Sequence, residues 1–195
     1  HPIDRTSSVY VAGHAGLVGS AVMRRLRAAG FSDIRTVTRS QLDLRNQAAV
    51  SRWFETNRPD HVYLVAGTVG GIMANSTRPA EFIYDNMMIH GTVVHAAHET
   101  NVTKLLYLGS SCIYPRHAVQ PITEEQLLTG PLEPTNEAYA LAKIVDEANK
   151  LLERFNVHRL APAHALERGK DLGLLHHSPG ERRGQRRQCQ GAILE

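Results

Sequence analysis

The stretch Val9-Tyr10-Val11-Ala12-Gly13-His14-Ala15-Gly16-Leu17-Val18-Gly19 indicates how this chain folds. A short apolar run, typical of a buried strand, precedes three glycines at three-residue spacing, and apolar residues then recur at helical spacing. The first glycine permits a sharp turn, the second admits a pyrophosphate to the backbone, and the third lets helix and strand pack closely. The alternative is an ordinary glycine-rich turn. The strand-loop-helix context favours a dinucleotide site formed by Gly13, His14, Ala15, Gly16, Leu17, Val18 and Gly19.

The alternation of strand and helix continues along the chain. Apolar runs predict further strands at 34–38, 61–66 and 104–108, and helical spacing predicts helices at 48–56, 79–99 and 134–155. Strands that alternate with helices form a parallel sheet covered on both faces. We therefore expect an α/β fold, a Rossmann-type doubly wound parallel sheet, with an irregular connection over residues 115–135.

Composition and charge divide the chain into two parts. Of 195 residues, 42% are hydrophobic and 21% are charged, and no apolar run approaches the ~20 residues that a membrane span needs. Residues 157–195 contain no aromatic residue and carry a net charge of +3, whereas residues 1–156 are neutral overall. We expect a nucleotide-binding domain over 1–156 and an irregular basic tail over 157–195, from truncated or out-of-frame coding sequence. Two cysteines are too few for a disulfide framework, so we expect a cytoplasmic protein.

The residue about 20 positions beyond the glycines indicates which dinucleotide binds. NAD-binding proteins usually have an acidic residue there, which holds the ribose 2′-hydroxyl. This chain has Arg39, and a guanidinium group pairs well with a 2′-phosphate. The sequence therefore favours NADP(H) over NAD, with Asp43 and Leu44 beside the adenine. The alternative is that Arg39 is a solvated surface residue.

A serine at a strand end and a Tyr-Lys pair on a later helix predict a proton relay. Ser110 follows the predicted fourth strand, and Tyr139 and Lys143 share one face of a helix, ~6 Å apart along its axis. A nearby ammonium group is expected to lower the pKa of a tyrosine from its ordinary ~10, and a serine can orient a carbonyl. These groups suit carbonyl reduction with a nicotinamide cofactor. By spacing alone, the alternative is a surface pair on a helix.

Four segments carry a resemblance to a known family: 12–21, Val69-Gly70-Gly71-Ile72, Leu108-Gly109-Ser110-Ser111-Cys112-Ile113-Tyr114-Pro115, and 132–140. Over about residues 8–150 the chain resembles the extended short-chain dehydrogenase/reductases and, within them, the GDP-L-fucose synthases. The resemblance implies NADP-dependent epimerisation and reduction of GDP-4-keto-6-deoxy-D-mannose. It also implies a homodimer through helices at about 79–99 and 139–155.

The resemblance also implies roles for individual residues. Tyr139 is expected to give a proton to the C4 oxygen, with Lys143 as its partner and a ribose ligand and Ser110 as the third member. Cys112 is expected to act as the acid-base group for epimerisation at C3 and C5, because a thiolate can abstract protons beside a keto group. A structural role as a small buried residue is the alternative for Cys112. Leu108, Gly109, Ser110 and Ser111 are expected to contact the cofactor, and no metal ligands are predicted.

The chain departs from this family in two places. Val65-Ala66-Gly67-Thr68 replaces the common Ala-Ala-Ala-Lys, and no C-terminal substrate domain is recognisable after about residue 155. Two alternatives to the implied function stay open: an NAD-type sugar-nucleotide epimerase or dehydratase, and a non-catalytic nucleotide-binding remnant. Nucleic-acid binding through the arginines of the tail is disfavoured, because no aromatic residue or recognition motif accompanies them.

Overall fold

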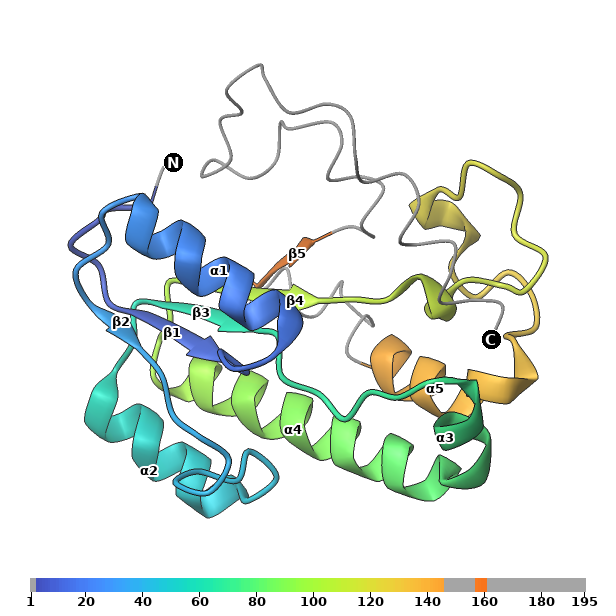
Figure 1. Ribbon diagram of the computed structural model, residues 1–195, viewed down its shortest axis with the longest axis horizontal. Helices are drawn as coiled ribbons and strands as arrows, with labels where there is room; N and C mark the ends of the chain where they lie inside the picture. The colour runs from blue at the N-terminus through green and yellow to red at the C-terminus, as the bar shows by residue number, and fades with distance from the viewer. Residues whose placement is uncertain (1–2, 146–156, 161–195) are drawn as a thin grey trace.

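Short apolar runs form a five-stranded parallel sheet in the computed structural model, which describes residues 3–145 and 157–160 (Figure 1). The strand order is β2-β1-β3-β4-β5. Every residue of β1 and β3 is buried, as expected for strands covered on both faces. The strands are β1 (Val9–Ala12), β2 (Ile34–Arg35), β3 (His61–Leu64), β4 (Lys104–Leu108) and β5 (Val157–Leu160).

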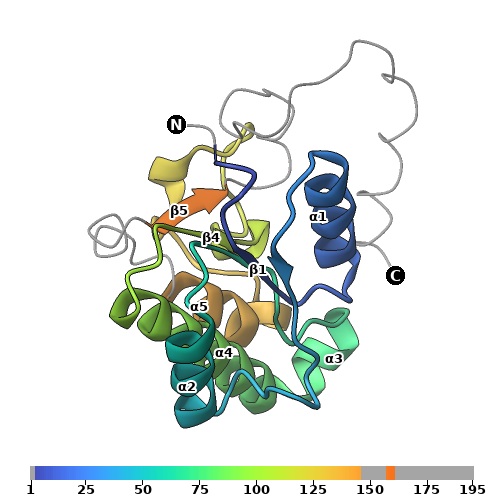
Figure 2. The ribbon, with the colours of Figure 1, turned by 90° about the vertical axis from the view of Figure 1, so that its left-hand side faces the viewer.

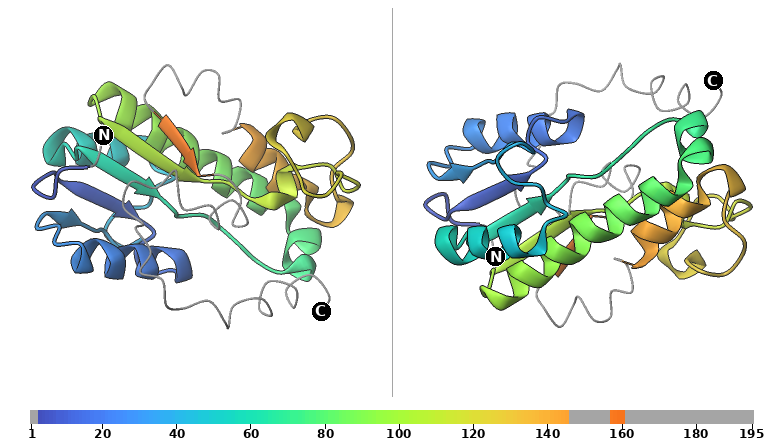
Figure 3. Two further views of the ribbon diagram at one scale, coloured as in Figure 1. Left: turned by 90° about the horizontal axis from the view of Figure 1, so that it is seen from above. Right: turned by 90° about the horizontal axis from the view of Figure 1, so that it is seen from below.

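Helices cover both faces of this sheet, with α1 on one face and α2, α4 and α5 on the other (Figures 2 and 3). The helices are α1 (Leu17–Ala28), α2 (Gln47–Asn57), α3 (Ile72–Thr77), α4 (Pro79–Glu99) and α5 (Glu137–Val145). None of these described helices is both long and apolar enough to cross a membrane. The doubly wound parallel sheet predicted from the sequence is confirmed.

Alternate residues of β1 pack against the two layers of helices. Val11 packs with Met23 of α1 on one face. On the other face Tyr10 packs against two aromatic residues of α2, with ring centroids 4.3 Å from Trp53 and 5.9 Å from Phe54. Because both faces of β1 are held in this way, the loop that follows β1 has a fixed starting point.

The strand order reverses at the carboxyl ends of β1 and β3. β1 lies between β2 and β3, so the chain moves outward from β1 in opposite directions across the sheet. In open parallel sheets, ligands bind where the strand order reverses in this way, because the two loops diverge and leave space between them. The glycine loop leaves β1 at this point.

An apolar cluster beyond the sheet holds the site helix α5 in place. The connection over residues 115–135 is irregular, as predicted, apart from short 3-10 turns at Glu124–Gln126 and, at its end, Pro134–Asn136. Ile113 and Tyr114, just after β4, pack against Ile144 of α5. This contact joins α5 to the carboxyl end of β4, where the candidate site lies.

Two local predictions are corrected by the structure, and one short helix, α3, was not predicted. Residues 157–160 form β5 where irregular structure is predicted; their pairing with β4 satisfies backbone groups at the sheet edge, which the composition does not reveal. β2 has two residues instead of five, because the Thr38 N–H donates to the Gln41 side chain and the chain leaves the sheet. The six residues of α3 are too few to show a helical period. The remaining predicted tail and residues 146–155 of the last predicted helix lie outside the described residues.

The buried histidine at the start of β3 makes the stability of the fold depend on pH. His61 is 8% exposed, and burial is the main cause that holds its pKa below the ordinary value of ~6.5. The unfolded chain therefore binds a proton at His61 more tightly than the folded chain does. The stability that is present above pH ~6.5 is lost as the pH falls from there through the pKa of His61 in the folded chain. We expect the free energy of unfolding in urea to fall from pH 7.5 to 5.5, and His61→Gln to reduce this fall. An equal fall in the variant would exclude His61 as a source.

Candidate functional site

The glycine loop joins β1 to α1 in a conformation that depends on two of its glycines. Gly13 has a φ of +93°, and a Cβ atom there would lie 2.7 Å from the backbone nitrogen of Ala66. A Cβ atom on Gly19 would lie 2.0 Å from the Gly13 carbonyl oxygen. At Gly16 the helix α1 has neither a side-chain cap nor an acidic residue in its first turn. The N–H groups of this turn therefore suit an anion, and the loop fits the predicted phosphate site.

The other loop residues predicted to contact the cofactor lie on this same turn. Ala15, Leu17 and Val18 are exposed, and His14 is half-buried. Leu17 is 91% exposed, although it begins a helix that otherwise packs on the sheet. Apolar exposure at this edge is consistent with a surface that a bound molecule covers. Their contact with a cofactor stays a prediction.

Arg39, predicted to select the cofactor, lies exposed in the loop after β2. Asp43, farther along this loop, accepts hydrogen bonds from Arg45, which lower the pKa of the Asp43 carboxyl to about 2. Leu44 packs against the core beside α2 and α4. The structure therefore brings Arg39 and Asp43 together, but Asp43 already has an arginine partner.

The residues after β4 form a compact turn. Leu108 ends the strand, and Gly109 and Ser110 lead into a 3-10 turn at Ser111–Ile113. This turn brings the Cys112 thiol back toward Ser110, and a hydrogen bond of 3.1 Å joins Ser110 Oγ and Cys112 Sγ. Cys112 is half-buried, so the alternative of a fully buried structural cysteine does not hold. Its thiol is placed beside a hydroxyl group at a strand end, where ligands bind.

Lys143 joins α5 to the end of β4. Its side chain is 5% exposed, and Nζ donates a hydrogen bond of 3.1 Å to the Leu108 carbonyl oxygen. Nζ also lies 4.6 Å from the centroid of the Tyr107 ring and 5.8 Å from the centroid of the Tyr139 ring. A buried ammonium group in contact with two aromatic rings is stabilised by cation–π attraction. The predicted Tyr139–Lys143 pair is therefore close, with the ammonium group directed at the strand end.

Tyr139 is a protonated phenol at neutral pH. Burial raises the pKa of Tyr139 to about 12; the charge of a nearby ionised Cys112 adds to this, while a hydrogen bond with Ser110 opposes it. The sequence predicts a lowered pKa for Tyr139, but the net shift is upward, because burial outweighs the hydrogen bond that opposes it. A phenol that keeps its proton can donate it, which suits reduction of a carbonyl group.

Several polar residues that the sequence reasoning missed hold the loop after β3. Asn86 is fully buried in α4; its Oδ1 accepts from the Thr68 N–H and its Nδ2 donates to the Thr68 carbonyl oxygen, both at 2.9 Å. Tyr107 and His90 share a buried contact of 3.3 Å between Oη and Nδ1. Asn86 and His90 lie among apolar residues of α4. Because buried polar groups need hydrogen-bond partners, their position in the sequence could have indicated that they bind other segments of the fold.

Comparison with known proteins identifies the family. The model of the "NAD dependent epimerase/dehydratase family" matches residues 9–155. The chain belongs to this family. It is 53% identical to GDP-L-fucose synthase of Escherichia coli (strain K12) over 148 residues, 76% of this chain and 46% of that protein. It is also 53% identical to GDP-L-fucose synthase 1 of Arabidopsis thaliana over 141 residues, 72% of this chain and 44% of that protein.

A solved structure gives the same result for the fold. MlghC, a GDP-mannoheptose C4 reductase from Campylobacter jejuni with NADP bound, is 36% identical and superposes with a TM-score of 0.76. The superposition covers 80% of this chain and 51% of that chain. This member of the epimerase/dehydratase family therefore spans about half the length of the relatives it matches.

Three of the four segments that carry the predicted resemblance lie at one edge of the sheet. The glycine loop follows β1, Val69-Gly70-Gly71-Ile72 follows β3, and Leu108–Pro115 ends β4 and continues beyond it. Carboxyl ends of neighbouring parallel strands share an edge, so the three segments face a common region. The resemblance to GDP-L-fucose synthases, predicted from these segments, is confirmed by the relatives.

Proposed function

We propose that this chain is the nucleotide-binding part of an NADP-dependent enzyme that epimerises and reduces GDP-4-keto-6-deoxy-D-mannose to GDP-L-fucose. The observation that carries the proposal is the cluster at the carboxyl end of β4. There the Ser110–Cys112 hydrogen bond lies beside a protonated phenol, Tyr139, and a buried ammonium group, Lys143. The named relatives support the choice of substrate class.

The residues of the chain fit an NADP(H) cofactor. The turn at Gly13–Gly19 leaves no room for a Cβ atom at its first and last glycines, and its open helix start suits the pyrophosphate. Arg39 would hold the 2′-phosphate, with Asp43 and Leu44 beside the adenine. Lys143 would hold the ribose next to the nicotinamide. Contacts at the end of β4 would come from Leu108, Gly109, Ser110 and Ser111. Arg39 also favours NADP(H) over the NAD-type alternative.

Reduction needs a proton for the carbonyl oxygen while the bound cofactor supplies hydride to the carbonyl carbon. Tyr139 gives this proton, because its phenol stays protonated at neutral pH. The Ser110 hydroxyl group orients the same oxygen, and Lys143 holds α5 against β4 so that the phenol stays in place. The negative charge left on Tyr139 is stabilised by the ammonium group 5.8 Å from its ring centroid.

Epimerisation needs a group that removes a proton beside the keto group and returns one to the sugar. Cys112 suits this step, because a thiolate is a competent base and the keto group acidifies the neighbouring C–H bonds. Ser110 Oγ, 3.1 Å from Cys112 Sγ, can donate a hydrogen bond to that thiolate. The two chemistries thus use neighbouring but different side chains.

Cys112→Ser separates these two steps. In the full-length protein we expect the variant to lose ~10²-fold or more in deuterium uptake from solvent at C3 and C5, since a serine hydroxyl group, unlike a cysteine thiol, does not ionise to a usable base near neutral pH. Mass spectrometry of the product follows deuterium, and NADPH absorbance follows reduction of a pre-epimerised substrate, which should stay within several-fold of wild type. Undiminished deuterium uptake would show that Cys112 is not the epimerisation base.

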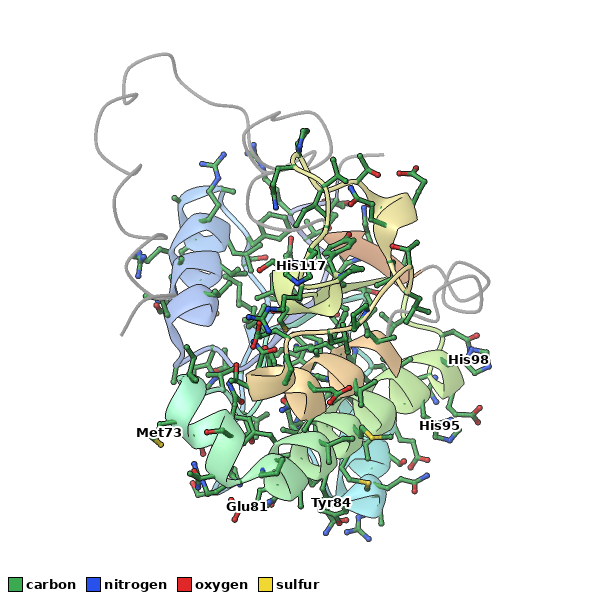
Figure 4. The ribbon with its side chains drawn as sticks, turned by 90° about the vertical axis from the view of Figure 1, so that its right-hand side faces the viewer. Met73, Glu81, Tyr84, His95, His98 and His117 are labelled. Carbon is green, nitrogen blue, oxygen red and sulfur yellow. The ribbon has the colours of Figure 1, made fainter. Side chains whose placement is uncertain are left out.

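We also propose that the protein is a cytoplasmic homodimer. Tyr84 and Met87 of α4 are 59% and 40% exposed, and Leu141 of α5 is 40% exposed. Figure 4 shows Tyr84, His95 and His98 directed away from the body of the molecule along α4. Large exposed side chains on two adjacent helices are typical of a face that another chain covers. The second copy would cover α4 and α5. The proposed domain is the nucleotide-binding unit of residues 1–156, and β5 extends it to residue 160.

A further inference from the structure

One guanidinium group bridges two carboxylates beside the proposed 2′-phosphate site. Arg45 Nε and Nη2 donate to the Asp43 carboxylate at 3.0 and 2.6 Å, and Nη1 donates to Asp85 Oδ1 at 2.8 Å. The other Asp85 oxygen accepts a hydrogen bond of 3.0 Å from the Thr68 hydroxyl group. These four side chains form a continuous polar chain, here called the Arg45 bridge: Asp43, Arg45, Asp85 and Thr68.

The Arg45 bridge joins three separate segments of the fold. Asp43 and Arg45 lie in the loop after β2, Thr68 lies in the loop after β3, and Asp85 lies in α4. The Thr68 end is fixed independently, because Asn86 of α4 pairs with both backbone polar groups of Thr68. Through Asp85, Arg45 therefore attaches the loop that carries Arg39 to a long, packed helix.

The Arg45 bridge also controls the charge around Arg39. Within residues 3–145, the Arg39 guanidinium group has no hydrogen-bond or ion-pair partner. The hydrogen bonds from Arg45 are the main cause that lowers the pKa of Asp43, and the charge of Arg39 lowers it further. At Asp85, burial acts to raise the pKa, but hydrogen bonds from Arg45 and Thr68, and the charges of Arg45 and Arg39, hold it below its ordinary value. Arg39 is thus close to both carboxylates, which Arg45 already pairs.

Removal of Arg45 would change both attraction and repulsion at this site. Two carboxylates without their partner would attract the exposed Arg39 guanidinium group into an ion pair. They would also repel a ribose 2′-phosphate, which carries close to two negative charges at neutral pH. A ribose with a free 2′-hydroxyl group has no such charge, so its binding would change little.

We propose that Arg45 is a positioning residue that sets cofactor choice: by pairing with both Asp43 and Asp85, it keeps Arg39 available for the 2′-phosphate. The proposal rests on the proposed NADP(H) function and deepens it. Arg45 acts through Arg39 and does not itself contact the cofactor.

Arg45→Met tests this role, since methionine keeps most of the length of the side chain without its charge. Titration by NADPH and NADH fluorescence should show NADPH binding weakened about tenfold and NADH binding within about twofold of wild type, given coupling between neighbouring charges. The double variant Arg45→Met/Asp85→Asn should recover much of the NADPH affinity, because one uncompensated charge is removed. Equal weakening of both cofactors, or no recovery in the double variant, would overturn the proposal.

Two further variants keep the test decisive. Arg45→Lys retains the charge but loses the forked hydrogen bonds, so we expect its NADPH affinity to fall by about threefold while its NADH affinity is unchanged. This variant carries the test if Arg45→Met does not fold. Arg39→Ala should weaken the binding of NADPH far more than the binding of NADH. If Arg39→Ala weakens the binding of both cofactors equally, the proposed 2′-phosphate site is excluded, and the proposed role of Arg45 is excluded with it. If Arg39→Ala is selective while Arg45→Met and Arg45→Lys are not, the role of Arg45 alone is overturned.

Discussion

Replacing Tyr139 with phenylalanine is expected to slow carbonyl reduction about 10²- to 10⁴-fold, the range that a positioned general acid contributes. Tyr139 is half-buried, and burial raises the pKa of its phenol to about 12, so it holds a proton at the pH of the assay. Phenylalanine keeps the ring beside Lys143 and removes the proton that the carbonyl oxygen needs. The decay of NADPH absorbance with GDP-4-keto-6-deoxymannose measures the rate in the full-length protein.

Tyr84→Phe is the matched control for this variant. Tyr84 lies on the proposed dimer face of α4, away from the end of β4, and phenylalanine keeps its aromatic ring, so loss of its hydroxyl group should leave reduction unchanged. NADPH affinity should also stay close to wild type in Tyr139→Phe, since the ring and the Lys143 hydrogen bond to Leu108 remain. Reduction at the wild-type rate by Tyr139→Phe would remove Tyr139 as the proton donor.

Gly19→Ala is expected to weaken NADPH binding at least tenfold and to destabilise the fold by about 1–3 kcal/mol, the usual cost of overpacking. A Cβ atom at Gly19 would lie 2.0 Å from the Gly13 carbonyl oxygen and 2.8 Å from the His14 Cα atom. These neighbours are backbone atoms, so the loop and the start of α1 must move apart. The phosphate site would then lose its geometry.

Gly91→Ala provides a control with the same chemical change. A Cβ atom at Gly91 has no neighbour within 4 Å, and the residue lies inside α4, where alanine favours the helix. We expect this variant to bind NADPH as wild type does and to melt at the same or a higher temperature. Unchanged NADPH titrations for Gly19→Ala would contradict the account of the loop.

The sequence predicts the glycine loop well because its constraints are local. Gly13, Gly16 and Gly19 act within one turn, and their spacing, together with the apolar run before them and the helical period after them, indicates a strand, a turn and a helix start. The position of Arg39 follows for the same reason, since it is counted from that turn. The Ser110–Cys112 contact spans two residues, so adjacency in sequence also implies adjacency in space.

Long-range features are those that the sequence could not predict. Arg45 and Asp85 are 40 positions apart, and their ion pair depends on how the loop after β2 meets α4. β5 pairs with β4 although the composition of this part of the chain predicts irregular structure. The pairing depends on the unpaired backbone N–H and C=O groups at the edge of β4, which the local sequence of β5 does not reveal. The upward shift of the Tyr139 pKa likewise depends on burial of this side chain in the folded chain. Each is a property of packing rather than of spacing.

Equilibrium titration of the chain with NADPH and with NADH, at one ionic strength, measures whether Arg39 selects the cofactor. We expect NADPH to bind at least tenfold more tightly, because Arg39 makes a charge-assisted contact of about 1.5–3 kcal/mol with the 2′-phosphate. The preference should also shrink as salt is added, because the contact is electrostatic. If NADH bound as tightly as NADPH, or if neither showed saturable binding, this chain would not be an NADP(H)-selective unit.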